Sequence, residues 1–174
     1  MSNVFKIYCL DFIINQIVMT KLYFYMLADC NILNSPACPN GWIHGPFSCY
    51  RFVTNNLVSW ETAQGLCQDM GGMLATLDSQ NEIYWLRGFR TSHANLNQRL
   101  LIGGYKKNDA WFWKGKLTDT PITNFKWIPG QPDKLPVPEN CLELANLEVN
   151  NWNDIPCDDG FKAGFICEKD FASK

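Results

Sequence analysis

The stretch ENCLELANLEVNNWNDIPC, residues 139–157, sets acids and amides directly beside two cysteines. Glu139 stands two residues before Cys141, and the tripeptide WND at 152–154 ends three residues before Cys157. A bridge between these two cysteines would close a short loop and keep both polar groups near one point. Asp and Asn also favour turns for purely local reasons, so the same residues could form an ordinary loop.

A second polar cluster, Gln131-Pro132-Asp133, lies just upstream. Together the two clusters offer three carboxylates and two side-chain amides, from Gln131, Asp133, Glu139, Asn153 and Asp154. All five are hard oxygen donors, which suit calcium with its flexible shell of oxygens. Zinc prefers nitrogen and sulfur, and magnesium demands near-octahedral geometry with several waters. The donor set therefore predicts a calcium site.

The cysteines indicate a disulfide framework in an oxidising compartment. The chain has eight: Cys9, Cys30, Cys38, Cys49, Cys67, Cys141, Cys157 and Cys167. No CxxC pair occurs, so zinc-ribbon spacing is absent. The last six could form three bridges, but six cysteines allow about 15 pairings. Cys9 and Cys30 are left unpaired.

The first 35 residues form a separate segment. Residues 7–28 are mostly apolar and are interrupted by Asp11, Asn15, Gln16 and Lys21. A secretion signal that starts at the internal Met19 is one interpretation. A membrane anchor and a misassigned start are the others, since a span needs about 20 apolar residues. A globular domain is expected at 38–169.

Helical and extended patterns alternate within this domain, which predicts an α+β fold. Ser59 can cap a helix over 60–70 that ends at Gly71-Gly72, and Ser79 with Glu82 forms a capping box for a second helix. The apolar runs LLIGG, AWFW, CLELA and GFICE are typical of antiparallel strands. The region 118–140 lacks periodicity, and such long loops are usually functional or disordered.

Charge and motif content exclude several functions. The formal net charge is −2 with no basic run, which gives no footprint for nucleic acid. GxSxG, HExxH and a glycine-rich phosphate loop are all missing, so no enzyme is expected. Asp158-Asp159-Gly160 is more typical of a turn than of a catalytic acid pair.

From Cys38 to Glu168 the chain resembles the C-type lectin-like domain in its long form, and it is similar to the perlucin-like lectins of molluscs. The matching stretches are CPNGWIHGPFSCYRF, SWETAQGLC, GQPD, ENCLEL, WND and GFICEK. The resemblance implies two helices flanking small antiparallel sheets, with a long calcium-binding loop region. It also implies the bridges Cys38–Cys49, Cys67–Cys167 and Cys141–Cys157.

In that family, the positions of Gln131, Asp133, Glu139, Asn153 and Asp154 bind one calcium ion and the sugar together. The resemblance also implies a cis bond before Pro132. The order Gln-Pro-Asp goes with galactose-type sugars. Lys134, Leu135 and Pro136 follow it where many galactose binders have a Trp, so mannose or fucose stays open. Lys106 and Lys134 occupy positions of the family's auxiliary calcium site, so a single ion is expected.

The function expected from the resemblance is calcium-dependent glycan binding outside the cell, in microbial recognition or matrix organisation. The partners would be glycans with terminal galactose or related sugars. Because one shallow site binds weakly, clustering in a homo-oligomer is a further expectation. The alternative is a lectin-like fold that binds protein or mineral surfaces without calcium or sugar.

Overall fold

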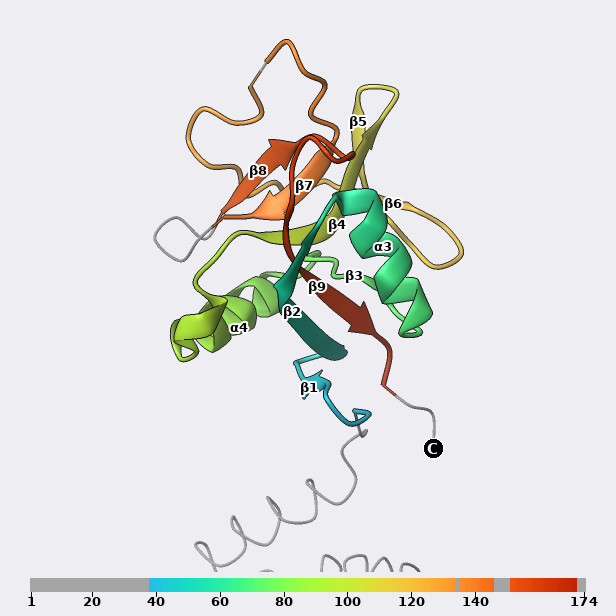
Figure 1. Cartoon of the computed structure of the whole chain (residues 1–174), viewed down its shortest axis with the longest axis vertical. Helices are drawn as coiled ribbons and strands as arrows, with labels where there is room; N and C mark the ends of the chain where they lie inside the picture. Colours follow the sequence, from blue (N-terminus) through green and yellow to red (C-terminus); the bar gives the residue numbers. More distant parts are fainter. Residues whose placement is uncertain (1–37, 134, 146–150, 172–174) are drawn as a thin grey trace, which may run out of the picture. The chain divides into compact units, whose positions relative to one another are not determined.

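The computed structural model describes residues 38–133, 135–145 and 151–171, which belong to one compact unit starting at Cys38 (Figure 1). The apolar segment at 1–35, with Cys9 and Cys30, lies outside the described residues. Within the described part, no helix combines the length and the apolar character that crossing a membrane requires.

Two helices and nine strands make up the described domain, which confirms the α+β class. The helices are α3 (Trp60–Asp69) and α4 (Gln80–Thr91), with a short 3-10 turn at Ala94–Leu96. The strands are β1 (Ile43–His44), β2 (Cys49–Val58), β3 (Met73–Leu74), β4 (Leu100–Lys107), β5 (Ala110–Trp113), β6 (Thr120–Pro121), β7 (Cys141–Leu144), β8 (Trp152–Ile155) and β9 (Ala163–Lys169).

The strands form one connected sheet in the order β1-β2-β9-β4-β5-β6. β3 pairs with β9, while β7 bridges β4 and β8. All pairings are antiparallel except β4 with β9, where Leu100 lies opposite Gly164 and Leu101 opposite Phe165. The expected separate small sheets are therefore joined through this parallel pair.

Alternation along the central strands gives the sheet two apolar faces. Leu100 and Ile102 of β4 belong to the core under α4, whereas Leu101 belongs to the core under α3. Residues of β9 alternate in the same way, because successive side chains of a strand point to opposite faces. Each face is covered by one helix, and Figure 1 shows α3 and α4 on opposite sides of the β2–β9 pair.

The helix ends are fixed differently. Ser79 accepts a hydrogen bond from the backbone N–H of Glu82 at 3.1 Å, and the Glu82 side chain returns to Ser79, so the capping box is confirmed. Ser59 precedes α3 but its side chain makes no cap, because its hydroxyl pairs with that of Thr62 at 3.0 Å instead. Ser59 therefore occupies the N-cap position as expected, but the prediction that its side chain caps the helix was wrong.

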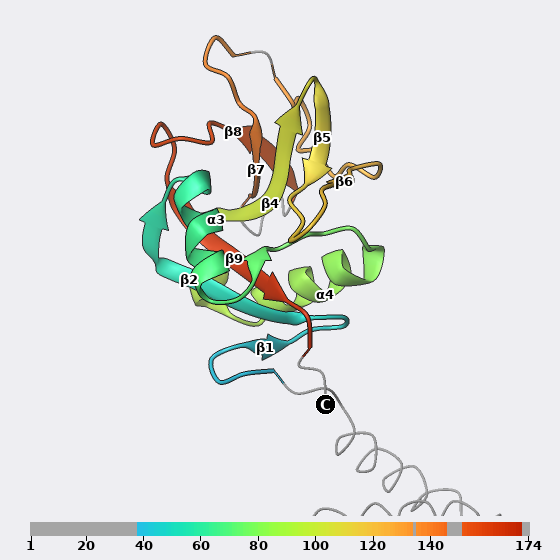
Figure 2. The same cartoon turned by 90° about the vertical axis from the view of Figure 1, so that its right-hand side faces the viewer.

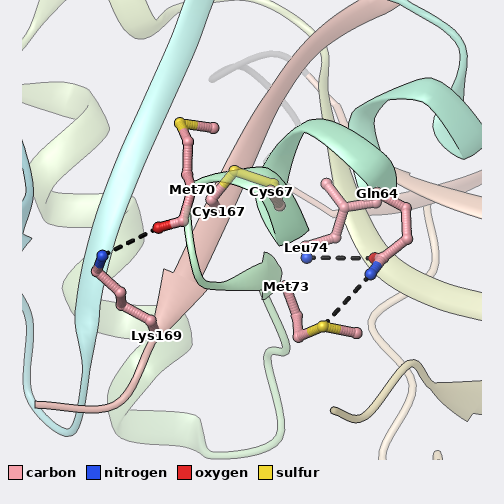
Figure 3. The surroundings of a disulfide bond; sticks show 7 residues. All are labelled: Gln64, Cys67, Met70, Met73, Leu74, Cys167 and Lys169. Carbon is pink, nitrogen blue, oxygen red and sulfur yellow. Dashed lines mark hydrogen bonds between the residues drawn. A yellow bond between two sulfur atoms is a disulfide. The ribbon is translucent and has the colours of Figure 1, made fainter.

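Three disulfides staple the described domain: Cys38–Cys49, Cys67–Cys167 and Cys141–Cys157. They are the pairings that the resemblance implies. Figure 3 shows Cys67 of α3 joined to Cys167 of β9, with Lys169 Nζ donating to the carbonyl of Met70 at 3.1 Å beside it. This bridge fastens α3 to the central strand of the sheet.

Both views place the β7–β8 hairpin and the long loop that precedes it at the end of the domain opposite β1 (Figures 1 and 2). The five residues proposed from the sequence all lie at this end, on the loop or on β8.

Candidate metal site

The β7–β8 hairpin brings two of the acids to the same end of one pair of strands. Leu142 lies opposite Asp154, and Cys141 lies opposite Ile155. The Cys141–Cys157 disulfide closes the hairpin just beyond these pairs. Glu139 enters β7 at the end from which Asp154 leaves toward Cys157, so the covalent link keeps the two carboxyl groups together.

Hydrogen bonds at Trp152 fix the start of the long loop to β8. The N–H of Trp152 donates to the carbonyl of Lys126 at 2.6 Å, and its carbonyl accepts from the N–H of Ile128 at 2.9 Å. The indole is buried against the edge of Trp113, with ring centroids 5.2 Å apart. Trp152 is therefore a core residue, and the strand that carries Asp154 also anchors the loop that leads to Gln131.

A tight turn carries the chain from this anchor to the first acid. The N–H of Gln131 donates to the carbonyl of Ile128 at 2.9 Å, and Gly130 has a φ of 95°, which suits glycine. The Gln131–Pro132 peptide is cis, as the resemblance implies. Gln131 Oε1 then accepts from the N–H of Asp133 at 2.8 Å, so the tripeptide holds its own shape.

Three carboxyl groups converge at this point. Oxygens of Asp133, Glu139 and Asp154 lie within 4.8 Å of one another. Asp154 is only 3 % exposed. Asp133 Oδ1 and Asp154 Oδ1 are buried and have no hydrogen-bond partner among the described residues. Buried polar atoms are almost always paired, so these two oxygens are suited to an external cation or donor.

The pKa values of Glu139 and Asp154 are both raised. Burial raises the pKa of Glu139, and the charges of Asp154 and Asp133 raise it further. Burial is also the main reason that the pKa of Asp154 is raised, with Asp133 adding repulsion and Lys106 opposing it. A divalent cation among the three would remove this repulsion, because it favours the ionised form of each acid.

The acids line a cavity of about 310 Å³. Its other lining residues are Lys106, Pro132, Leu135, Val137, Pro138 and Asn140. Leu135 and Val137 are 56 % and 58 % exposed, so one wall is apolar and open to solvent. Lys106 Nζ lies 3.7 Å from Asp109 at the tip of the β4–β5 hairpin. Lys134 lies outside the described residues.

The two amides proposed from the sequence have different hydrogen-bond partners. Gln131 Nε2 donates to Asp133 Oδ2 at 3.3 Å. Asn153 precedes Asp154 in β8, and its Nδ2 donates to Glu143 Oε1 at 3.2 Å. The structure describes all five proposed residues. Of these, the three carboxylates of Asp133, Glu139 and Asp154 converge on one point.

Sequence reasoning missed Glu143 and its partner Arg99. Glu143 is 1 % exposed, and Arg99 Nε donates to its two oxygens at 2.8 and 2.7 Å. The signal was an acid inside the apolar run CLEL, since a charge in a buried strand requires a partner.

Comparison with known proteins identifies similar sequences. The family model described as Lectin C-type domain matches residues 56–169. C-type lectin domain family 4 member E of Mus musculus is 33% identical over 152 residues, which cover 85% of this chain and 66% of that protein. The galactose-specific lectin nattectin of Thalassophryne nattereri is 32% identical over 76% of this chain and 80% of its own. Perlucin of Haliotis laevigata is 32% identical over 76% and 83%.

Solved structures share the architecture. The mouse scavenger receptor C-type lectin carbohydrate-recognition domain has a TM-score of 0.65 at 27% identity, covering 78% of this chain and 100% of that one. A complex of SPL-1 with GlcNAc has a TM-score of 0.65 at 26% identity, covering 78% and 96%. Herring type II antifreeze protein has a TM-score of 0.63 at 27% identity, covering 78% and 100%.

Proposed function

Because the chain belongs to the C-type lectin domain family, we propose that it binds carbohydrate through one calcium ion held by Gln131, Asp133, Glu139, Asn153 and Asp154. The observation that carries the proposal is the convergence of three carboxylates within 4.8 Å, two of whose buried oxygens have no partner among the described residues. Carboxylate and amide oxygens are the ligands that calcium prefers.

The bound calcium, the carboxylates and the amides would each make a different kind of contact with the sugar. Bound calcium supplies a positive centre that sugar hydroxyls can ligate. The carboxylates accept hydrogen bonds from those hydroxyls, while the amides of Gln131 and Asn153 can donate to them. Lys106 on the cavity wall opposes a second cation nearby, which supports a single ion.

Galactose-type sugars are the proposed ligand class. The order Gln131-Pro132-Asp133 supports this, and one similar protein is named as a galactose-specific lectin. The exposed Leu135 and Val137 offer an apolar contact to the sugar ring where an aromatic side chain is missing. Because one similar structure is a GlcNAc complex, the binding test should include other sugars besides galactose.

We also propose that the domain acts outside the cell as a binding protein rather than as an enzyme. Three disulfides support an oxidising compartment. Clustering of copies would add avidity of about 10²–10⁴ to a weak single site, and this suits microbial or matrix glycans.

Retention of the full chain on galactose-agarose tests the proposal. We expect retention in millimolar calcium, elution by EGTA, and no retention of Asp154→Ala. Asp159→Ala is the matched control, because Asp159 is exposed five positions further along and pairs only with Lys162 at 3.3 Å among the described residues.

Two results would contradict the proposal. Retention that is unaffected by EGTA would favour the alternative of protein or mineral binding, which the fold similarity to herring type II antifreeze protein supports. Retention on mannose but not on galactose would overturn the sugar class while leaving the calcium site in place.

A further inference from the structure

Glu143 is a buried acid that lies outside the cluster of Asp133, Glu139 and Asp154. It lies in the middle of β7, is 1 % exposed, and faces Asn153 across the β7–β8 ladder. An ionised carboxylate in such a place is costly unless its oxygens are paired.

Arg99 provides that pairing. Its Nε donates to Glu143 Oε2 at 2.7 Å and to Oε1 at 2.8 Å, and its Nη2 also contacts Oε1. The Arg99 side chain is 49% exposed, and its guanidinium lies 4.3 Å from the ring centroid of Phe161. Glu143 is therefore held in one orientation by a cation that stays partly in water.

The geometry also determines which way the Asn153 amide faces. A carboxylate only accepts hydrogen bonds, so the atom of Asn153 that faces Glu143 must be the nitrogen. Nδ2 lies 3.2 Å from Glu143 Oε1. The carbonyl oxygen on the same amide group is then directed away from Glu143 and is left as a ligand atom.

We propose that Glu143, held by Arg99, is a positioning residue that fixes the amide of Asn153 with its oxygen available to calcium. This inference rests on the proposed function. Outer partners of metal ligands affect metal affinity by about 10–100-fold, because they set the orientation of the ligand before the metal arrives.

Calcium titration calorimetry on the full chain tests the inference. Glu143→Leu removes the acceptor at similar size, and we expect it to weaken calcium binding by roughly 10-fold. Asn153→Ala should weaken binding by a similar factor. The double variant should bind no more weakly than Asn153→Ala alone, because both changes disable the same ligand.

A conservative variant and a stability readout separate positioning from other roles. Glu143→Gln keeps an acceptor for Nδ2, so its dissociation constant should stay within about threefold of wild type. Melting temperatures in EGTA show whether each variant is folded before calcium is added. A purely structural role would lower these temperatures and leave the dissociation constant of the folded protein unchanged.

The possible failures are distinguishable. Unchanged affinity in Glu143→Leu, or additive losses in the double variant, would overturn the inference while the calcium site stands. Complete loss of binding in Glu143→Gln would make Glu143 a direct ligand and would also overturn it. A wild-type chain that binds no calcium would instead refute the proposed function.

Discussion

Two clusters of carboxylic acids in this domain differ in how many hydrogen-bond donors surround them. Glu82 and Glu168 lie near Tyr50, where the tyrosine hydroxyl donates to Glu82 and the N–H of Thr76 donates to Glu168 at 2.8 Å. Asp133, Glu139 and Asp154 converge at the other end of the domain, and two of their buried oxygens lack partners among the described residues. The acids of the first cluster accept hydrogen bonds from the protein itself, so their role is to stabilise the fold. The second cluster has fewer protein donors, so it is a candidate binding site.

The electrostatic cost of ionising the buried acids also differs between the two clusters. Burial and the charge of Glu82 raise the pKa of Glu168, and two hydrogen bonds from Thr76 oppose part of this rise. Burial raises the pKa of Glu139, the neighbouring acids Asp154 and Asp133 raise it further, and the charge of Arg99 opposes the rise. Changes to the Tyr50 cluster should therefore lower stability with or without calcium, whereas changes to the site should lower stability only when calcium is present.

The largest expected effect is on the architectural side. Replacing both Cys67 and Cys167 by Ser opens a loop with a sequence separation of 100 residues. The chain-entropy account gives a loss of about 4.7 kcal/mol in the free energy of unfolding. Urea denaturation should show this loss equally in EGTA and in calcium. A loss confined to the calcium-bound protein would break the division between the two regions.

Removal of a site acid should have the next largest effect, and only with calcium. At 10 mM calcium, a dissociation constant near 10⁻⁴ M gives about 2.7 kcal/mol of stabilisation. Asp154→Ala should lose this increment while keeping or slightly raising its stability in EGTA, because a repelling charge is gone. Thermal melts of the variant and of Asp159→Ala provide the measurement. A large loss in EGTA would mean that Asp154 is architectural.

A matched change in the Tyr50 cluster should show the reverse pattern. Glu82→Ala leaves the Tyr50 hydroxyl and the N–H of Ser79 without their acceptor. Buried donors that lose a partner cost roughly 1–3 kcal/mol. The loss should appear in EGTA and in calcium alike, with an unchanged calcium affinity by calorimetry. Weaker calcium binding would show that the two clusters are coupled.

Acidification should give the smallest effect, with opposite signs in the two states. The folded-state pKa values of Glu139 and Asp154 are raised, so their contribution to stability is present at low pH and is lost as pH rises through those values. Without calcium, lowering the pH from neutral should therefore stabilise the site. With calcium, protons compete for the same oxygens, so the calcium-induced rise in melting temperature should shrink.

Melting curves at several pH values, each with calcium and with EGTA, check this sign. Glu168 also has a raised pKa but titrates in both conditions, so the difference between the paired curves isolates the site. A calcium-induced rise that grows toward acid pH would contradict the assignment.

Many elements of the fold and the acids of the site could be predicted from the sequence, because they follow from short sequence patterns. The capping box at Ser79, the strands in their apolar runs and the acids beside Cys141 and Cys157 all have short-range patterns. The family resemblance supplied the disulfide pairing and the cis bond at Pro132.

The parts that sequence reasoning missed depend on residues far apart in the chain. The parallel pairing of β4 with β9 joins residues more than 60 positions apart. Glu143 and Arg99 meet only when β7 packs along β4. Such contacts depend on tertiary packing, which no local pattern encodes.

Calcium titration of the wild-type chain beside Asp154→Ala is the most direct test of the central claim, that three converging carboxylates form a calcium site. We expect the wild type to bind one ion with a dissociation constant of about 10⁻⁴–10⁻³ M, and the variant to give no binding heat. Equal binding by the two proteins, or no binding by either, would contradict the claim.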